Sequence, residues 1–514
     1  MFRIDAPERT GRPLRWNPLA LAATCALLLA SCSADGNDGP IAAGDGAAVA
    51  PAVSSAPTDP ASTEQQLPAF VGKLDIDPAR GSIGSMVTVT GTGFDPDADL
   101  VLAWEDTTAT WNVDMVEGKY YGRDFVTEAV PLVDVTTSAD GSFEAEFEVP
   151  EDFGFTHNVT LQDGDTVLNR AGYRTEMEMT ISPTSGPVGT PITLEVQGMG
   201  YSYLENSWQL TYDNSYTGWM SSVTTDGSAT AVIPATGAPG THIIQLTHGW
   251  SHVPYLNNQQ SPRPDRPIFT FEFTVTDGPA VLPPPPDEQG LPIVPAEPPA
   301  DDGTAAIWTD VASGPVGTPI VMSGHNLPSE PLALMWYRQE GSRVSGSGYS
   351  EVGLELGTAT PDADGSMTFE FEALDDLGGP HRIEAMAGDA AVATTEFDIK
   401  PSAFAVENGV GPAGTMALFH AKGVGWTETA NIYTLVYDNS YVGFACAFNS
   451  QGDIQIYLPL AGEPGLHYVD LYPAIYRGED IRGAVNFRLP QLTYADDHPG
   501  EELPAFHFVV EVTE

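Results

Sequence analysis

The feature that most constrains this chain is an internal duplication. The stretch from Tyr212 to Leu246 returns without a gap as Tyr437 to Leu471. Both copies begin Tyr-Asp-Asn-Ser-Tyr-x-Gly, and both later carry Pro-x-x-Gly-x-Pro-Gly-x-His. The matched residues keep a constant offset of 225 positions. A chance peptide match would not hold its register for so long, so the pattern indicates that a whole domain is duplicated.

A second pattern divides the chain further. Apolar residues and threonines alternate from Met86 to Thr92 between glycines, which predicts a strand that enters a turn. Similar glycine-threonine patterns, which we call openings because each begins a repeat, recur at Gly189-Thr190-Pro191-Ile192, at Gly317-Thr318-Pro319-Ile320 and at Gly414-Thr415-Met416. Four openings predict four domains.

Each predicted domain then carries a turn and a histidine. The turns are Asp140-Gly141, Asp226-Gly227, Asp364-Gly365 and Gln451-Gly452, and we expect hairpins there because Asp-Gly favours them. The histidines are His157, His242, His381 and His467. The spacing from turn to histidine is seventeen residues in the first and third domains and sixteen in the second and fourth. The order of domains is therefore A-B-A′-B′.

The opening of each repeat resembles that of IPT/TIG domains, the immunoglobulin-like β-sandwiches of cell-surface and bacterial exported proteins. The likeness is best in the first two repeats, where Gly91-Thr92-Gly93-Phe94 and Gly198-Met199-Gly200-Tyr201 follow the predicted strand. The third repeat departs from the pattern with Gly324-His325-Asn326-Leu327, and the fourth is loose. The resemblance implies an all-β fold of four tandem immunoglobulin-like β-sandwiches.

The N-terminus has the features of an export signal. Four arginines within the first fifteen residues precede a short apolar run from Leu19 to Ala30, which has the proportions of a signal h-region. The run ends in Leu29-Ala30-Ser31-Cys32, which resembles the lipobox of bacterial lipoproteins. The resemblance implies cleavage before Cys32 and lipid, including palmitate, on that residue. Because Ser33 and not Asp follows, it also implies export to the outer membrane. An ordinary secretory signal that happens to contain Cys32 is the alternative.

Composition accounts for the remaining segments. Residues 32–68 are rich in Ala, Gly, Ser, Pro, Asp and Thr, which predicts a disordered tether. Residues 278–304 contain four consecutive prolines, which favours a stiff polyproline II spacer that holds the two halves apart. The expected plan is a signal peptide at 1–31, the tether at 32–68, domain A at 69–176, domain B at 177–277, the linker at 278–304, domain A′ at 305–400 and domain B′ at 401–514.

The charge argues against one class of partner. Seventy acidic residues face twenty basic ones, for a formal net charge of −50. Such a chain repels phosphate backbones, so no nucleic-acid partner is expected. A solvated acidic surface explains the charge, and calcium binding is the alternative. Asp95, Asp97 and Asp99 have part of a calcium loop's spacing, but Leu100 stands where the sharp turn needs glycine.

The sequence lacks the common catalytic motifs. It contains no Gly-x-Ser-x-Gly elbow, His-Glu-x-x-His helix, Cys-x-x-Cys pair or phosphate loop. One histidine in each of four domains cannot converge on a single ion, so we expect these histidines to be structural. Cys446 aligns with Ser221, which predicts a small buried strand residue and not a nucleophile. No enzymatic activity and no organic cofactor are expected.

The remaining candidate for binding is the Tyr-Asp-Asn-Ser-Tyr motif of the B-type domains. Long segments at 247–267 and 472–505 could fold over it, and aromatic faces beside carboxylates and amides suit a glycan or a peptide. Asp-Asn-Ser is also good turn chemistry, so a purely structural role is the alternative. The tentative ligand residues form two equivalent sets: Tyr212, Asp213, Asn214, Tyr216 and Trp219 in B, and Tyr437, Asp438, Asn439, Tyr441 and Phe444 in B′.

These observations lead to one function hypothesis and two alternatives. The leading hypothesis is a lipid-anchored, non-catalytic binding or adhesion protein of the outer membrane that recognises a glycan or protein partner through its B domains. An architectural spacer of the cell envelope and an extracytoplasmic hydrolase are the alternatives. Fold class alone does not choose among them.

The lipid anchor gives a direct test. Replacing Cys32 by alanine removes the thiol that would carry the lipid. A Cys32→Ala protein should therefore lose radiolabelled palmitate and leave the membrane fraction. Retention of both the label and the membrane association would contradict the lipoprotein assignment.

Overall fold

The computed structural model describes residues 70–514 except 203–204, 251–252, 262–265, 343–347, 481–482 and 486. The chain divides into two units, residues 1–68 and 69–514, and the account below concerns the second. The signal peptide, the tether and Cys32 lie outside the described residues, so these assignments stay predictions. No helix among the described residues has the length and apolar character that crossing a bilayer requires.

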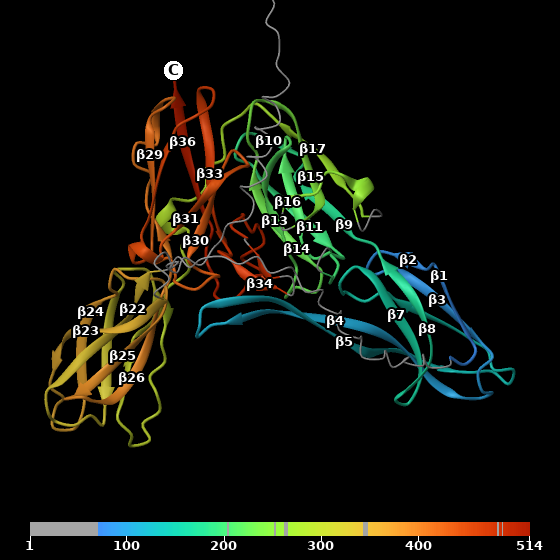
Figure 1. The fold of residues 1–514 in the computed structure, drawn as a ribbon, viewed down its shortest axis with the longest axis horizontal. Helices are drawn as coiled ribbons and strands as arrows, with labels where there is room; N and C mark the ends of the chain where they lie inside the picture. The colour runs from blue at the N-terminus through green and yellow to red at the C-terminus, as the bar shows by residue number, and fades with distance from the viewer. Residues whose placement is uncertain are drawn as a thin grey trace, which may run out of the picture. The chain divides into compact units, whose positions relative to one another are not determined.

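The described strands form four successive β-sandwiches (Figure 1). Sandwich A contains β1 (Lys73–Asp77), β2 (Arg80–Gly81), β3 (Met86–Thr92), β4 (Asp99–Asp114), β5 (Lys119–Thr136), β6 (Phe143–Glu148), β7 (Phe155–Asp163) and β8 (Thr166–Thr175). Sandwich B contains β9 (Glu178–Ser182), β10 (Ser185–Gly186), β11 (Pro191–Gln197), β12 (Trp208–Tyr212), β13 (Ser215–Met220), β14 (Ala229–Pro234), β15 (Gly240–Trp250), β16 (Val253–Pro254) and β17 (Phe269–Val275).

The second pair of sandwiches repeats the first. Sandwich A′ contains β19 (Ala306–Thr309), β20 (Val311–Gly314), β21 (Pro319–His325), β22 (Leu332–Ser342), β23 (Gly348–Ala359), β24 (Met367–Glu372), β25 (Gly379–Ala387) and β26 (Ala390–Ile399), and the linker strand β18 (Val294–Pro295) joins its larger sheet. Sandwich B′ contains β27 (Ser402–Ala403), β28 (Val410–Pro412), β29 (Met416–Lys422), β30 (Ile432–Tyr437), β31 (Ser440–Cys446), β32 (Ile454–Pro459), β33 (Gly465–Ala474), β34 (Gly478–Asp480), β35 (Gly483–Val485) and β36 (Phe506–Thr513). The three short 3-10 helices of the described residues are η1 (Asn258–Gln260), η2 (Pro286–Glu288) and η3 (Phe448–Ser450).

All four sandwiches share one topology. A three-stranded sheet, such as β14-β11-β9 in B, faces a larger sheet, such as β10-β17-β15-β12-β13. A short opening strand pairs in parallel with the last strand of its sandwich in every copy: β2 with β8, β10 with β17, β20 with β26 and β28 with β36. The prediction of an all-β chain of tandem immunoglobulin-like β-sandwiches is confirmed.

The predicted period of two places the cores. In β11 the side chains of Ile192, Leu194 and Val196 are buried, and the residues between them are more exposed. Strand residues alternate between faces, so one face of the strand enters the space between the sheets. Burying one such aliphatic side chain contributes about 1.5–3 kcal/mol, and each sandwich has its own apolar cluster.

The Asp-Gly turns do not close hairpins, which corrects the sequence prediction. The turn at Asp140-Gly141 joins β5 of the larger sheet to β6 of the smaller one. A Cβ on Gly141 would lie 2.1 Å from the carbonyl oxygen of Phe94, so this glycine allows the turn to pack on the end of β3. Where two strands of the larger sheet form a hairpin in B and B′, the turn is the Asp-Asn of the Tyr-Asp-Asn-Ser-Tyr motif.

Apolar residues of B′ also enter the core of sandwich B. Val436, Tyr472 and Leu492 of the second half pack within the same cluster as Met220 and the other core residues of B. The expectation that residues 278–304 hold the halves apart is therefore wrong. Instead, the Val281 N–H donates to Val188 of B at 2.9 Å, and Gln289 exchanges hydrogen bonds with the backbone of His507 in β36.

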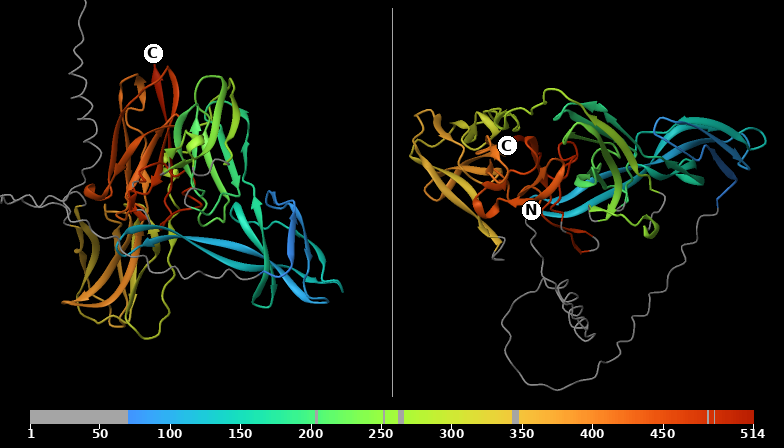
Figure 2. Two further views of the ribbon diagram at one scale, coloured as in Figure 1. Left: turned by 45° about the vertical axis from the view of Figure 1, so that its right-hand side comes forward. Right: turned by 90° about the horizontal axis from the view of Figure 1, so that it is seen from above.

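A long arm from sandwich A also packs against the two B domains, and we call the combined packing of A, B and B′ the interlock. The β4–β5 hairpin extends as a two-stranded ribbon (Figure 2). Near its tip, the Tyr120 N–H donates to the Glu428 carboxylate, and the Trp111 indole N–H donates to Asp497 at 2.8 Å. Tyr120 also joins Trp219, Ile475 and Phe487 in a small separate apolar cluster. Residues from sandwiches A, B and B′ thus complete one another's packing.

This shared packing predicts that the halves do not fold independently. Fragments 69–277 and 278–514, produced separately, should each unfold at a lower temperature than the intact chain. Separation exposes Val436, Tyr472 and Leu492, and each buried apolar side chain contributes about 1.5–3 kcal/mol. Circular dichroism melts of each fragment, of their mixture and of the intact chain measure the effect. Unchanged midpoints in the isolated fragments would contradict the shared core.

Candidate functional site

The Tyr-Asp-Asn-Ser-Tyr motifs form tight two-residue hairpin turns. In B the turn residues Asp213 and Asn214 have φ of 47° and 64°, and in B′ Asp438 and Asn439 have φ of 46° and 60°. Two successive residues with positive φ match the right-handed twist of the flanking strands, and Asp and Asn tolerate this conformation better than most residues. The motif therefore forms the turn of the hairpin in both B domains.

The turn aspartate is also bound to the histidine of the same domain. In B′ the Asp438 Oδ2 lies 2.5 Å from Nδ1 of His467, and Oδ1 accepts the Tyr468 N–H at 3.0 Å. Nε2 of His467 lies 2.9 Å from the carbonyl oxygen of Glu463, and the ring stacks on Tyr437. Sandwich B repeats each of these contacts with Tyr212, Asp213 and His242. We call this arrangement the histidine corner.

The corner explains the glycine that accompanies the motif. A Cβ on Gly462, which has φ of 115°, would lie 2.3 Å from Cε1 of His467. The histidine ring can reach the turn only because this residue has no side chain. The two motifs, Pro-x-x-Gly-x-Pro-Gly-x-His and Tyr-Asp-Asn-Ser-Tyr, thus recur together because the histidine of the first binds the aspartate of the second.

Sandwiches A and A′ build the corner from a tryptophan. His157 stacks on Trp104 with the ring centres 4.6 Å apart, and the Trp104 indole N–H donates to Asp152 at 2.7 Å. His381 and Trp336 have the same geometry in A′, with Asp376 as the acceptor. In all four sandwiches the histidine Nε2 contacts the carbonyl oxygen four residues earlier. The structure thus places all four histidines in structural contacts.

Hydrogen bonds in the B′ corner favour the protonated form of His467. Burial raises the pKa of Asp438, although its hydrogen bond to His467 acts in the opposite direction. Burial acts to lower the pKa of His467, but hydrogen bonds to Asp438 and to the Glu463 carbonyl outweigh it and raise that pKa. Both ring nitrogens of His467 face oxygen acceptors, which favours the imidazolium form.

The two motif copies are not equivalent sites, contrary to expectation. Trp219 is 1% exposed, whereas its counterpart Phe444 is 42% exposed. Asn214 is exposed, whereas Asn439 is buried and donates to the Pro234 carbonyl oxygen at 2.8 Å. The copies differ because residues 490–492 of B′ pair with the backbone of the B hairpin. On β31 the described contacts of the same loop involve side chains: the Arg488 guanidinium lies over the Phe444 ring, 4.9 Å from its centre, and the Tyr441 hydroxyl donates to the Arg488 carbonyl oxygen at 2.6 Å.

The motif instead contributes to the contact between the two copies. Tyr216 and Tyr441, which occupy equivalent positions, meet edge to face with ring centres 6.4 Å apart. The Thr217 hydroxyl donates to the Asn439 carbonyl oxygen at 2.7 Å. The structure brings the hairpins together, but it leaves Trp219 and Asn439 without an open surface for a ligand.

Cys446 differs from expectation, and the three aspartates of the calcium-loop alternative lie on the surface. Cys446 is exposed on β31 and not buried as predicted, whereas its counterpart Ser221 is buried with its hydroxyl 3.3 Å from that of Thr493 in B′. Asp95, Asp97 and Asp99 lie exposed at the turn before β4, where Asp99 accepts the Thr136 hydroxyl at 2.9 Å. Within the described ranges, no group of three or more His, Cys, Asp or Glu side chains is placed to hold a metal ion.

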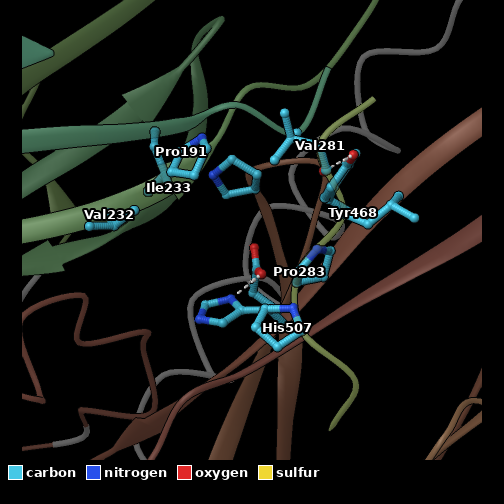
Figure 3. Close-up of a pocket in the computed structure, with 12 residues that line it drawn as sticks. Pro191, Val232, Ile233, Val281, Pro283, Tyr468 and His507 are labelled. Carbon is cyan, nitrogen blue, oxygen red and sulfur yellow. Dashed lines mark hydrogen bonds and ion pairs between the residues drawn. The ribbon is translucent and has the colours of Figure 1, made fainter. Parts of the chain in front are cut away.

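The junction of B and B′ contains a cavity that sequence reasoning missed. Its volume is about 210 Å³. Figure 3 shows Pro191, Val232 and Ile233 on one side and Tyr468 and His507 on the other. The full lining is Gly189, Pro191, Val232, Ile233, Pro234, Val281, Leu282, Pro283, Pro284, Tyr468, Asp470 and His507. Most of these groups are apolar.

Asp470 brings charge to the wall of the cavity. Its Oδ1 lies 2.7 Å from Nδ1 of His507, and its side chain is 2% exposed. Burial acts to lower the pKa of His507, but the hydrogen bond and charge of Asp470 outweigh it and raise that pKa. The Asp470 Oδ2 and the Tyr472 hydroxyl, both buried, have no hydrogen-bond partner among the described residues. An unmet buried polar atom costs about 1–3 kcal/mol, so a donor supplied here would be stabilising.

One sequence signal could have pointed to this cavity. The strand before the second long loop carries Asp470 at a position where the first copy has Gln245. A charged residue that appears on the β strand of only one copy is a departure from the duplication. Its partner His507 lies far away in sequence, so the pair itself could not be foreseen.

Comparisons with known proteins do not assign a family. No family model matches the chain, and no curated protein matches it. Among solved structures, Salmonella alpha-2-macroglobulin is 11% identical with a TM-score of 0.19, over 86% of this chain and 31% of that chain. The Yersinia pseudotuberculosis adhesin InvE is 11% identical with a TM-score of 0.19, over 40% and 58%. An ICAM-5 D1-D4 ectodomain fragment is 11% identical with a TM-score of 0.18, over 86% and 99%.

These likenesses are too low to carry an argument about function. This chain spans about a third of the length of the alpha-2-macroglobulin that it matches. The β-sandwich assignment rests on the sheet topology of the chain itself.

The histidine corner predicts a stability effect. Asp438→Ala removes two hydrogen bonds of a charged group, and we expect a loss of about 1.5–3 kcal/mol in the free energy of unfolding. The exposed neighbour Glu463→Ala, whose carbonyl still contacts His467, serves as the matched control. Chemical denaturation of both variants and the parent measures the difference. A loss no greater than that of the control would show that the corner is not stabilising.

The same variant should show a defined pH dependence. A histidine whose pKa is raised by folding stabilises the fold below its unfolded pKa of about 6.5, and this stabilisation is lost as the pH rises through the raised value. The difference between the parent and Asp438→Ala should therefore be larger at about pH 6 than at about pH 9. An equal difference at both would argue against a charged His467.

Proposed function

We propose that this chain is a non-catalytic binding protein, held at the outer membrane by lipid on Cys32, that meets its partner at the junction of sandwiches B and B′. The IPT/TIG resemblance of the openings supports an exported, surface-facing role. The B domains remain the binding region. Within them, the proposed site is the cavity between the two copies and not the two motif hairpins.

The cavity at this junction is the observation that carries the proposal. It joins apolar walls from B and the linker to the buried Asp470 carboxylate of B′, one oxygen of which has no partner in the described part of the chain. Apolar pockets with a few converging polar groups are the usual form of a ligand site. The walls suit an aliphatic or aromatic side chain, and Asp470 suits a donor such as an amine or hydroxyl beside it. We therefore favour a peptide segment of a protein partner.

A pair of variants on one strand tests this site. Val232 is 47% exposed and lines the cavity, so Val232→Trp should fill it without disturbing the core. Thr230, two residues earlier on the same face of β14 and outside the lining, gives the control Thr230→Trp. Peptide and glycan arrays are probed with the parent and both variants. Hits of the parent should weaken at least tenfold in Val232→Trp and persist in Thr230→Trp.

The outcomes separate the alternatives. Hits that bind Val232→Trp as well as the parent would place the binding surface elsewhere. Hits confined to glycans would replace the peptide assignment. Turnover of generic ester, glycoside or peptide substrates by the parent would favour the hydrolase. An architectural role would leave both arrays empty.

A further inference from the structure

Sandwiches B and B′ are copies, yet their equivalent edges differ. In B, residues 490–492 of B′ lie beside the edge strand β13 and pair with it. Trp219 of β13 and Gln491 form a parallel bridge. The Trp219 N–H donates to the Pro490 carbonyl oxygen at 2.8 Å, and the Leu492 N–H donates to the Trp219 carbonyl oxygen at 2.8 Å. An extended segment therefore pairs with this edge as an added strand.

The added strand also contributes a core side chain. Leu492 lies against Gly218, where a Cβ would be 2.8 Å from the Leu492 side chain and 2.7 Å from the Pro490 carbonyl oxygen. Leu492 is 8% exposed and belongs to the apolar core of B. It closes the gap between the two sheets at this edge.

In B′ the equivalent edge carries no such strand within the described part of the chain. The counterpart of Trp219 is Phe444, which pairs with Thr434 of β30 on one side. On its other side, no backbone group of the described residues pairs with it. The counterpart of Gly218 is Gly443, and a Cβ there would meet no atom of the described residues within 4 Å. Nearby, Ala445, Ile456 and Leu458 are only partly buried against the B′ core.

This edge carries two partly exposed apolar side chains, and the Arg488 guanidinium lies over one face of the Phe444 ring at 4.9 Å from its centre. Val442 is 52% exposed and Phe444 is 42% exposed. Natural sheets cover or charge such apolar edges, because their backbone groups pair readily with another chain. In B the chain covers the edge with its own segment.

We propose that β31 receives an extended segment of a partner protein, laid parallel to the strand, with an aliphatic side chain seated over Gly443 as Leu492 is seated over Gly218. The segment's carbonyl accepts the Phe444 N–H, and a following N–H donates to the Phe444 carbonyl. The partner is a polypeptide, because only a peptide backbone supplies this alternation of acceptor and donor. A second copy is disfavoured, since its own residues 490–492 already pair with β13. This site is separate from the cavity and does not depend on it.

A synthetic peptide tests the proposal. Residues 487–495 of this chain, Phe-Arg-Leu-Pro-Gln-Leu-Thr-Tyr-Ala, carry the segment that pairs with β13. A fluorescent copy is titrated with the full chain, and anisotropy measures binding. We expect saturable binding at one site, and at least tenfold weaker binding by a Gly443→Val protein, because the new side chain occupies the seat. A peptide carrying Leu492→Asp should also bind at least tenfold more weakly.

Controls distinguish this site from others. Val410 is 63% exposed on β28, the opposite edge of the same sheet, so Val410→Trp should bind the peptide as the parent does. The cavity variant Val232→Trp should also bind it normally, so failure here and failure of the cavity proposal are separable. Should Gly443→Val lower the melting temperature, the Leu492→Asp peptide decides the question with the parent protein.

Three results would overturn the proposal. The first is that the parent protein shows no saturable binding of the peptide. The second is that Gly443→Val, melting as the parent does, binds the peptide as tightly as the parent. The third is that the Leu492→Asp peptide binds the parent as tightly as the unmodified peptide does. Sedimentation of the full chain tests the other occupant. Self-association that Gly443→Val abolishes would identify a second copy as the occupant and not a different protein.

Discussion

The rest of the structure depends on the burial of one face of sandwich B by segments from elsewhere in the chain. Leu492 enters its core, Pro490 and Leu492 pair with its edge, and the arm of sandwich A packs against Trp219. Asp497 ties these pieces together. Its Oδ1 accepts the Trp111 indole N–H and the Thr224 N–H, and its Oδ2 accepts the Val223 N–H. One buried carboxylate thereby links sandwiches A, B and B′.

The interlock gives two copies of one domain different surfaces. The same hairpin is buried in B and partly open in B′, because the loop that follows β33 pairs its backbone with β13, whereas its described contacts with β31 are those of Arg488 with Phe444 and Tyr441. Duplication thus supplies a covered edge and an open edge, together with a cavity where the copies meet. Each of the two proposed binding surfaces depends on this asymmetry. Neither depends on a catalytic group.

Several features could be predicted because they are local. Alternation from Met86 to Thr92 identifies a strand, and the paired Asp and Asn of the motif suit a tight turn. The expectation that His467 and its counterparts are structural could be reached by counting one histidine per domain. The hairpin predicted at Asp140-Gly141 was wrong, because turn propensity does not say which sheet the next strand joins. Burial of Cys446 was also wrong, because exposure depends on what covers a strand.

The sequence by itself determined the all-β class, the four openings and the duplication, since these follow from residue periodicity and a constant register. Only the tertiary structure decided that the halves share a core, that Trp219 is buried while Phe444 is exposed, and that Asp470 meets His507 at a cavity. The reason is physical. Periodicity reports the local backbone, whereas packing between copies depends on side chains hundreds of residues apart. Two nearly identical stretches therefore have different environments.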